Sequence, residues 1–372
     1  MSFLSHFSDL SDPRSHINVK HNFLDVMFLA VSAVSSGAEG WSDIEDFGRD
    51  KLTWLKQYRR FENGIPVDDT IARIIRVVCP KQLNQAFLNW VNEIRVETGK
   101  PQIAIDGKTL RHSYDGDKHT ALHSITAWSK DAGIVLAQLK SSGKKNENAS
   151  VLEMLYTLDI KGALISADTM NSQKKIVAKI QAGQADYVLC IKNNQKSLRE
   201  EISAYFHKVQ RDTPEIITHD EQTDAGHGRI EVRRCQQLLV SEWITEAKHW
   251  AGMRSIIKLE RERHVKGKPT TIETQFYISS LGIDPQATSQ AIRAHWEVEN
   301  KAHWVLDVTY KEDDCRIRKD DGAENVGVIR RFCLNMARLH PKKASMRRKL
   351  KMAGWADEFR TELILVKSVR LP

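Results

Sequence analysis

Gln102-Ile-Ala-Ile-Asp106-Gly-Lys108 is a short apolar run that ends at an acidic turn, and it marks where the chain changes from helices to strands. Before it, apolar residues recur at helical spacing, whereas after it short apolar runs alternate with turn residues. A later run, Ala163-Leu-Ile165, likewise leads to an acid at Asp168. Because ligands of open α/β sheets gather at the carboxyl ends of strands, we expect the two aspartates at one edge of a sheet.

The order of elements after Gln102 indicates an α/β core. The Ser150–Glu153 pattern is typical of a capping box that starts a helix, and a second helix is expected from Ser172 to Gly183. Strands are expected at 102–105, 121–128, 134–139, 163–165 and 187–191, the second and third forming a hairpin. Three strands, helix, strand, helix, strand is the order of the ribonuclease-H-like fold, although other three-layer α/β folds come close.

A β-rich segment follows this core. After a helix from Leu198 to Phe206, apolar residues alternate or cluster within residues 213–280, which predicts strands at 231–235, 255–259 and 274–278. A further helix runs from Ala323 to Leu339, and Pro341 ends it. The basic run that follows is a solvated face or a phosphate contact, and we expect phosphate contact that weakens with salt.

The first 96 residues read as helices. One spans Phe23 to Ser35, and Ser42 with Glu45 three residues later gives a capping-box pattern for the next. A third follows the turn at residues 63–66 and is expected to be capped by an aspartate, Asp68 or Asp69.

Two arginines of this third helix, Arg73 and Arg76, point away from its apolar face of Ile71, Ile74 and Ile75. Two helices across a Gly-Pro turn, the second carrying arginines, are compatible with a helix-turn-helix DNA reader. The alternative is a small helical bundle whose arginines are solvated. We predict DNA contact.

Composition favours a globular protein with a polyanionic partner. The chain has 372 residues, 41% of them hydrophobic, a formal net charge of +8 and a pI near 9.1. Such an excess of Lys and Arg suits nucleic acid, and equally a merely basic soluble protein. The five cysteines form no CxxC pair and no secretory signal is visible, so a cytoplasmic, nucleoid-associated location is expected.

The stretch Arg293-Ala-His-Trp-Glu-Val-Glu-Asn-Lys-Ala-His-Trp304 reads as a continuous α-helix. Steps of three and four residues put an unusual stripe along one side; its members are Ile292, His295, Trp296, Glu299 and His303. A pure core stripe would be aliphatic, so a polar partner is expected to meet this face. The two indoles either stack on a splayed base or pack into the core.

Three clustered carboxylates would need cations. If Asp106, Asp168 and Glu299 meet, each bare pair about 4 Å apart repels by roughly 1 to 4 kcal/mol. Oxygen-only ligands select Mg²⁺ or Mn²⁺, and two such ions can activate a water or a 3′ hydroxyl at a phosphodiester. The alternative is that the aspartates are turn or cap residues.

Motifs spread along nearly the whole chain resemble the DDE transposases of the H-repeat-associated (IS-As-one type) group of bacterial insertion sequences. The segments that carry the resemblance, in order, are Glu62–Thr70, Ala104–Arg111, Ser166–Gln173, Asp186–Gln195, His227–Glu231, His295–Asn300 and Glu312–Arg318.

This resemblance implies an α/β fold with a ribonuclease-H-like mixed sheet flanked by helices, a β-rich insertion and an all-helical N-terminal domain. It implies Asp106, Asp168 and Glu299 as catalytic residues that hold two Mg²⁺ or Mn²⁺ ions. It also implies double-stranded DNA as the partner of a homodimer on paired ends. The expected domains are 1–96 (DNA-binding), 97–210 (first part of the core), 211–284 (insertion), 285–340 (end of the core) and 341–372 (basic tail).

Glu299 is preferred over Glu297 because it shares a helix side with His295 and His303, and because it matches the Trp-x-(Ile/Val)-Glu pattern of related transposases. The same histidines with Glu299 would also suit a zinc face, but zinc prefers nitrogen and sulfur ligands and the resemblance favours oxygen.

Several side chains are candidate DNA contacts through phosphate or stacked bases; they are Arg73, Arg76, Lys108, Arg111, Lys192, Asn194, His227, Arg229, His295, Trp296 and His303. The sequence thus predicts a transposase that cleaves element ends and joins them to target DNA. The alternatives are a metal-dependent nuclease with the same core and a domesticated DNA-binding relative without catalysis.

Overall fold

The computed structural model describes residues 2–14, 19–95, 101–114, 121–141, 146–226 and 228–365. It divides into two compact units that interleave along the chain. The first comprises residues 1–97, 107–146 and 299–372, and the second comprises residues 98–106 and 147–298. The domain boundaries expected from the sequence remain predictions, and each unit is described by itself.

In the described part of the chain, nine strands form one mixed sheet with the order β3-β2-β1-β4-β5-β9-β8-β7-β6. The strand bounds are β1 (Gln102–Thr109), β2 (His123–Ser129), β3 (Ile134–Ser141), β4 (Leu164–Ala167), β5 (Asp186–Ile191), β6 (Thr218–Gly226), β7 (Arg229–Leu239), β8 (Ser255–Val265) and β9 (Thr271–Ser279). A mixed sheet with flanking helices and a helical N-terminal region agrees with the predicted fold class.

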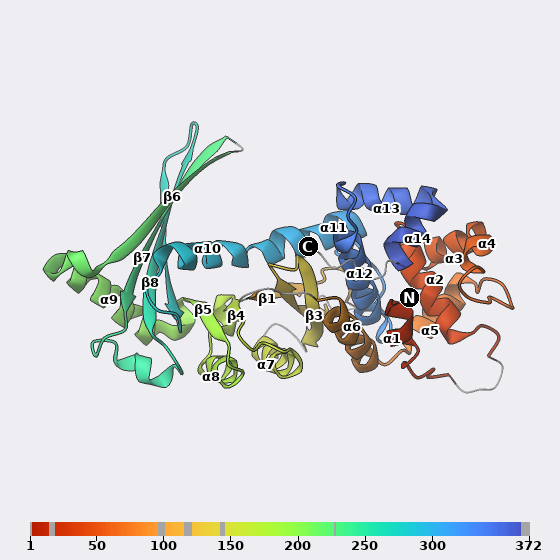
Figure 1. Ribbon diagram of the computed structural model, residues 1–372, viewed down its shortest axis with the longest axis horizontal. Coiled ribbons are helices and arrows are strands. Elements are labelled where there is room, and N and C mark those ends of the chain that lie inside the picture. Colours follow the sequence, from red (N-terminus) through yellow and green to blue (C-terminus); the bar gives the residue numbers. More distant parts are fainter. Residues whose placement is uncertain are drawn as a thin grey trace. The chain divides into compact units, whose positions relative to one another are not determined.

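In the second unit, the parallel strands β1, β4 and β5 are apolar because they are covered on both faces. Helices lie on opposite sides of these strands, α7 and α8 on one side and α10 on the other (Figure 1). The helices of this unit are α7 (Glu147–Thr157), α8 (Lys174–Ala182), α9 (Lys196–Asp212) and α10 (Pro285–His295). The predicted helix end at Gly183 is confirmed, since Gly183 is the C-cap of α8.

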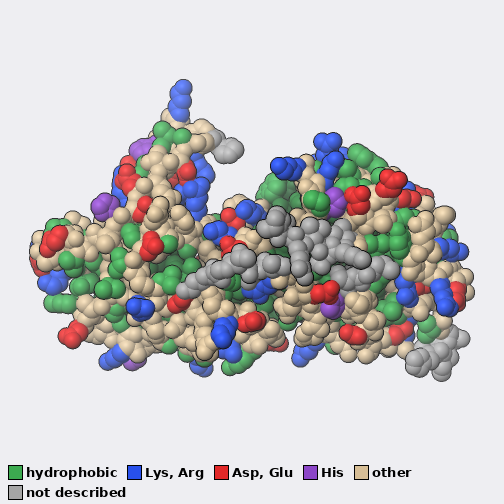
Figure 2. Space-filling model, viewed as in Figure 1, with side chains coloured by type: hydrophobic (Ala, Val, Ile, Leu, Met, Phe, Trp, Pro, Cys, Tyr) green, Lys and Arg blue, Asp and Glu red, His purple; other side chains and the backbone are tan. Residues whose placement is uncertain are grey.

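The β-rich segment extends the same sheet. β9 pairs antiparallel with β5, and β8, β7 and β6 follow in antiparallel order. β6 was not expected from the sequence, because its Thr218–Gly226 stretch is polar and mostly exposed. Cross-strand ion pairs hold this arm, where Arg234 contacts both Glu221 and Glu262. Basic and acidic side chains accordingly lie interspersed on the arm in Figure 2.

The first unit is built around α12 (Gly322–Leu339), which is buried along nearly its whole length. Its Phe332 packs against the aromatic rings of Phe7, Phe87 and Trp90. The other helices of this unit are α1 (Ser2–Phe7), α2 (Phe23–Ser35), α3 (Trp41–Asp50), α4 (Leu52–Leu55), α5 (Asp68–Arg76), α6 (Pro80–Ile94), α11 (Trp304–Tyr310), α13 (Met346–Trp355) and α14 (Asp357–Leu365).

The expected hairpin is confirmed, since β2 pairs antiparallel with β3, and β3 packs on α12. β3 is the last strand of the sheet, and Asn335 of α12 binds the backbone of one of its residues. The Asn335 side chain accepts from the N–H of Val135 at 2.9 Å and donates to the Val135 carbonyl at 2.8 Å. A buried amide thus satisfies backbone groups that an edge strand would otherwise leave open.

Three predicted helix caps are wrong. α3 begins at Trp41 with Gly40 as its N-cap, and Asp43 accepts from the backbone N–H groups of residues 39 and 40. Glu45 instead reaches the next helix, where it accepts from the N–H of Asp68 at 2.7 Å. α5 therefore has Val67 as its N-cap, with both aspartates inside the first turn. Ser150 lies inside α7, which begins at Glu147.

Part of the basic run after Pro341 lies in α13, which holds Arg347, Arg348, Lys349 and Lys351, and its contact with phosphate stays a prediction. Lys349 is buried, and its ammonium donates to the carbonyls of Ala337 and His340 at the end of α12. A cation at a helix C-terminus is favourable, so this lysine has a structural role. None of the helices in the described part of the chain has the length and apolar character needed to cross a bilayer.

Candidate active site

Two aspartates follow registered positions of neighbouring parallel strands in the second unit. β1 pairs with β4 so that Ile105 lies opposite Ala167, and Asp106 and Asp168 are the next residues along. Neighbouring strands lie about 4.8 Å apart, so both carboxylates start from the same edge of the sheet. Both residues are half-buried, which leaves their carboxylates within reach of a ligand.

Asp168 also starts the short 3₁₀ turn Thr169–Asn171, where its carboxylate accepts from the N–H of Thr169 at 2.6 Å. Asn194 holds this turn from the end of β5, since its side chain donates to the Thr169 carbonyl at 2.7 Å. Asn194, predicted as a DNA contact, therefore has a structural partner. Asp168 itself has no ion-pair partner among the described residues.

A small hollow adjoins Asp168. Lys192, His295 and Trp296 line it together with residues of β4, β5, β9 and α10. Lys192 is exposed, so its ammonium can reach a phosphate at this edge. Trp296 is 39% exposed and its ring meets that of His295 edge-to-face at 6.0 Å.

His295 is held neutral in this hollow. Burial lowers its pKa to about 4, against the weaker opposing effect of the Asp168 carboxylate. Its Nδ1 lies 3.2 Å from the Ser166 hydroxyl. A neutral imidazole can share a hydrogen bond with a ligand but contributes no positive charge toward a phosphate.

Glu299 does not lie in a continuous α-helix, and the prediction of one from Arg293 to Trp304 is wrong. α10 ends at His295, and Val298–His303 (η7) forms a π-helix that leads into α11. π segments widen the turn and occur frequently at functional sites. The residues expected along one side of a single helix therefore do not share one face. Ile292 and His303 are buried, whereas Glu299 is exposed.

Glu299 is also the first residue of the first unit's last segment, whereas the two aspartates belong to the second unit. Its place beside them stays a prediction. Among the described residues, no three His, Cys, Asp or Glu side chains are arranged to hold a metal ion. Asp106 and Asp168 by themselves supply hard oxygen ligands of the kind that Mg²⁺ and Mn²⁺ prefer, so they fit such an ion as a two-carboxylate platform.

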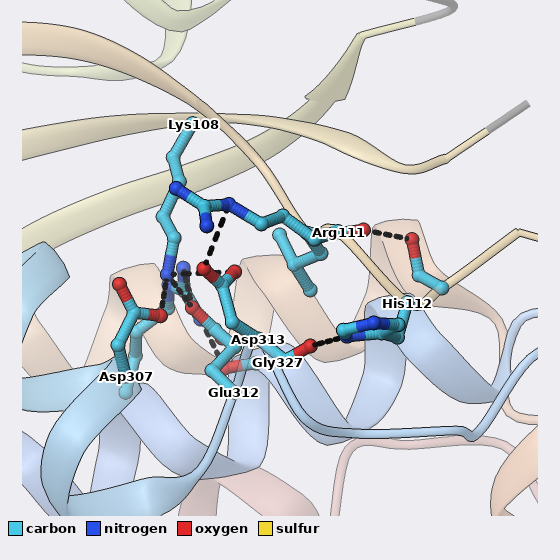
Figure 3. Close-up of polar contacts among 10 residues, drawn as sticks. Lys108, Arg111, His112, Asp307, Glu312, Asp313 and Gly327 are labelled. Carbon is cyan, nitrogen blue, oxygen red and sulfur yellow. Dashed lines mark hydrogen bonds and ion pairs between the residues drawn. The ribbon is translucent and has the colours of Figure 1, made fainter. Parts of the chain in front are cut away.

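A second group of acids gathers around Lys108 in the first unit (Figure 3). We call it the Lys108 cluster; its members are Lys108, Arg111, Asp307, Glu312, Asp313 and Arg331. The Lys108 ammonium contacts the Asp307 carboxylate closely and lies 3.5 Å from oxygens of both Glu312 and Asp313. Arg111 contacts Asp313 at 3.4 Å from the exposed side.

Glu312 is the centre of this cluster and is fully buried. Burial alone would raise its pKa, but the charges of Arg331 and Lys108 outweigh burial and hold the pKa at about 2. Arg331 of α12 binds Glu312 with both terminal nitrogens and also donates to the Gly327 carbonyl. Burial raises the pKa of Asp307, although Lys108 opposes that rise.

Comparison with known proteins assigns the chain to a family. Residues 97–336 match the family described as Transposase DDE domain, and residues 4–91 match the family described as DDE_Tnp_1-associated. The chain belongs to the DDE transposase family.

Relatives within this family match almost end to end. The "H repeat-associated putative transposase YhhI" of Escherichia coli K12 is 39% identical, over 94% of this chain and 94% of its own. The "Putative transposase YncI" of Escherichia coli O157:H7 is 38% identical, over 91% of this chain and 87% of its own. The "Inactive transposase YbfQ" of Escherichia coli K12 is 54% identical, but over 19% of this chain and 86% of its own.

The remaining candidate DNA contacts of this family member are dispersed. Arg73 is exposed on α5, whereas Arg76 packs against Gly322 at the start of α12. Arg229 is exposed at the start of β7, and His227 lies outside the described residues. His303 is buried in η7. Of this set, Arg73 and Arg229 are placed where a DNA backbone could reach them.

The sequence does not predict which acids bind Lys108. The Glu312–Arg318 motif carries part of the family resemblance, but the sequence assigns it no partner. Its run of three acids followed by two arginines is the available signal. In the structure Arg318 donates to the His112 carbonyl at 2.9 Å. The Glu312–Arg318 motif therefore docks on the segment that follows Asp106.

Proposed function

We propose that this protein is a DNA transposase that cleaves insertion-element ends in a metal-dependent reaction and transfers the freed strand into target DNA. The observation that carries the proposal is the pair Asp106 and Asp168, each one residue past a registered pair of adjacent parallel strands. Glu299 is proposed as the third carboxylate, supplied by the helical segment after α10.

In this proposal the three carboxylates bind one or two Mg²⁺ or Mn²⁺ ions. Such ions, when bound, activate the attacking oxygen and stabilise the leaving oxygen of a phosphodiester. The protein's own contribution is to fix ligand geometry: the sheet sets the spacing of Asp106 and Asp168, and Asn194 steadies the turn after Asp168. Lys192 is proposed to hold the scissile strand by its phosphate.

DNA binding is proposed to be mainly electrostatic. The net charge of +8 supports it, as do the exposed side chains of Arg73, Arg111, Lys192 and Arg229. A homodimer on paired element ends is proposed because two ends must be cut and joined together.

The test is a cleavage and joining assay on a labelled duplex that carries the flanking element end. Wild type is expected to nick and join with Mg²⁺ and to do neither with EDTA. Asp106→Asn and Asp168→Asn should abolish both products while DNA binding in EDTA is retained. A metal-dependent product that survives in both variants would contradict the proposed ligands.

A non-catalytic DNA-binding relative is the second candidate, and it is motivated by the similarity to the "Inactive transposase YbfQ". It predicts salt-sensitive DNA binding with no cleavage under any metal condition. A stand-alone nuclease would cleave without joining and without preferring an element end. The same assay distinguishes all three.

A further inference from the structure

The Lys108 cluster is balanced in charge and has a buried centre with an exposed rim. Asp307, Glu312 and Asp313 oppose Lys108, Arg111 and Arg331. The side chains of Glu312 and Arg331 are 0% exposed, and that of Lys108 is 10% exposed. Buried ion pairs of this kind contribute little net stability relative to apolar packing. Their presence calls for a reason other than stability.

The cluster joins the two stretches of chain that flank the proposed ligands. Lys108 is two residues after Asp106 on β1, and side chains two residues apart in a strand lie on the same face. Asp307 lies on α11, which directly continues the π-helix that carries Glu299. Contact between Lys108 and Asp307 therefore ties the strand leaving Asp106 to the helix leaving Glu299.

Lys108 is engaged by acids in this arrangement. Its ammonium donates to Asp307 and Glu312 and lies within ion-pair distance of Asp313. Releasing it to a phosphate would leave Glu312 with one cation fewer in a fully buried site, which is costly. Figure 3 shows the Lys108 side chain directed at these acids. The alternative role as a phosphate contact thus requires the cluster to open.

We propose that Lys108 is a positioning residue, whose contacts with Asp307, Glu312 and Asp313 hold Asp106 and Glu299 in the geometry that binds the divalent cation. This inference rests on the proposed function. It assigns the Glu312–Arg318 motif a role in metal-site geometry rather than in DNA contact. Partners that orient metal ligands typically change metal affinity or activity by about 10- to 100-fold when they are removed.

The first experiment measures Mn²⁺ binding without DNA, by electron paramagnetic resonance, on wild type, Lys108→Met, Lys108→Arg and the control Lys161→Met. Lys161 is an exposed lysine in the turn before β4 and outside every proposed site. Lys108→Met is expected to weaken Mn²⁺ binding by about 10- to 100-fold, Lys108→Arg to restore part of the loss, and Lys161→Met to change nothing. Unchanged Mn²⁺ affinity in a folded Lys108→Met protein would overturn the inference.

The second experiment separates positioning from DNA contact. DNA binding in EDTA, as a function of salt, should be the same for Lys108→Met and wild type, while the Mg²⁺ concentration for half-maximal cleavage rises. If Lys108 contacts a phosphate, binding in EDTA weakens and the salt slope falls by about one. That result would overturn the inference and would leave the proposed transposase activity intact.

If Lys108→Met does not fold, a variant of its partly exposed partner Asp307 tests the same inference. Asp307→Asn removes a carboxylate whose side chain is 29% exposed and leaves Lys108 with Glu312 and Asp313. It should weaken Mn²⁺ binding in the same direction, and its effect should be non-additive with that of Lys108→Arg. If wild type binds Mn²⁺ through Asp106 yet never cuts DNA, the proposed function fails while these binding comparisons still decide the inference.

Discussion

Asp168 and Glu312 are both acids close to a lysine, yet the protein treats them in opposite ways. Glu312 is fully buried, and Arg331 and Lys108 hold its pKa at about 2. Asp168 is half-buried at a strand end, and in the described chain its carboxylate accepts a backbone N–H but forms no ion pair. The protein supplies the cations for Glu312 itself. It leaves Asp168 available to a cation from solution, which is the difference expected between a structural acid and a metal ligand.

The largest effect is expected for Asp168→Asn, and retained activity in this variant would contradict the role of Asp168 as a metal ligand. We expect this variant to lose strand cleavage by about 10³-fold or more, because a metal ligand contributes several kcal/mol to the transition state. Its melting temperature without metal should match that of wild type, since no ion pair is lost. The measurements are single-turnover cleavage and a thermal melt. A large loss of stability would place Asp168 with the structural acids.

Glu312→Gln should show the reverse pattern. Removing the charge leaves Arg331 buried without its counter-ion, and breaking such a pair costs about 3 to 5 kcal/mol. Urea unfolding followed by circular dichroism measures this loss of free energy. Glu260→Gln is a matched control, because its ion pair with Lys258 is on a partly exposed strand. Equal stability of the two variants would remove the distinction between buried and exposed pairs.

The pH dependence of stability tests whether Glu312 is held in its charged form by ion pairs. The pKa of Glu312 is about 2 in the folded protein, below its ordinary value of 4.5, so its contribution is fully present above about pH 4.5. It should be lost as the pH falls from 4.5 toward 2, by about 3 kcal/mol in all. The difference in unfolding free energy between wild type and Glu312→Gln should shrink over that interval. A difference that stays constant down to pH 2 would contradict the charged-pair account.

The smallest effect is expected at the rim of the Lys108 cluster. The Arg111 side chain is 79% exposed and contacts Asp313 at 3.4 Å, so Arg111→Gln should cost less than about 1 kcal/mol of stability. If Arg111 contacts a DNA phosphate as predicted, the salt slope of binding should fall by about one. Binding titrations at several salt concentrations measure that slope. If Arg111→Gln lost as much stability as Glu312→Gln, the exposed Arg111–Asp313 pair would contribute as much to the free energy of unfolding as the buried Glu312–Arg331 pair.

The strand-end aspartates could be predicted because their signal is local. Each is preceded by a short apolar run, and sheet geometry then brings the ends of neighbouring parallel strands together. The strand β6 could not be predicted in this way, because its polar residues are stabilised by cross-strand partners rather than by a buried face. Burial patterns in the sequence carry no information about such partners.

The π-helix and the Lys108 cluster were missed for a different reason. A stretch without Gly or Pro reads as α-helix, and nothing in the residues 298–303 themselves indicates a widened turn. Lys108 meets its acids across about two hundred residues of chain, and its position beside Asp106 had suggested a phosphate contact instead. Side-chain chemistry identified the charged residues, but the fold determined which charges meet.

That long separation has a consequence for synthesis of the protein on the ribosome. Lys108 and Asp307 are 199 residues apart in sequence. At about 5 to 20 residues per second, translation of the intervening segment takes about 10 to 40 seconds. Within that interval, after Asp168 has been added and before Glu299 is, the nascent chain contains both aspartates but lacks Glu299, Asp307, Glu312 and Asp313. A chain terminated before Asp307 would remain in that incomplete state, so translation must pass Asp307 before the geometry proposed for catalysis can form.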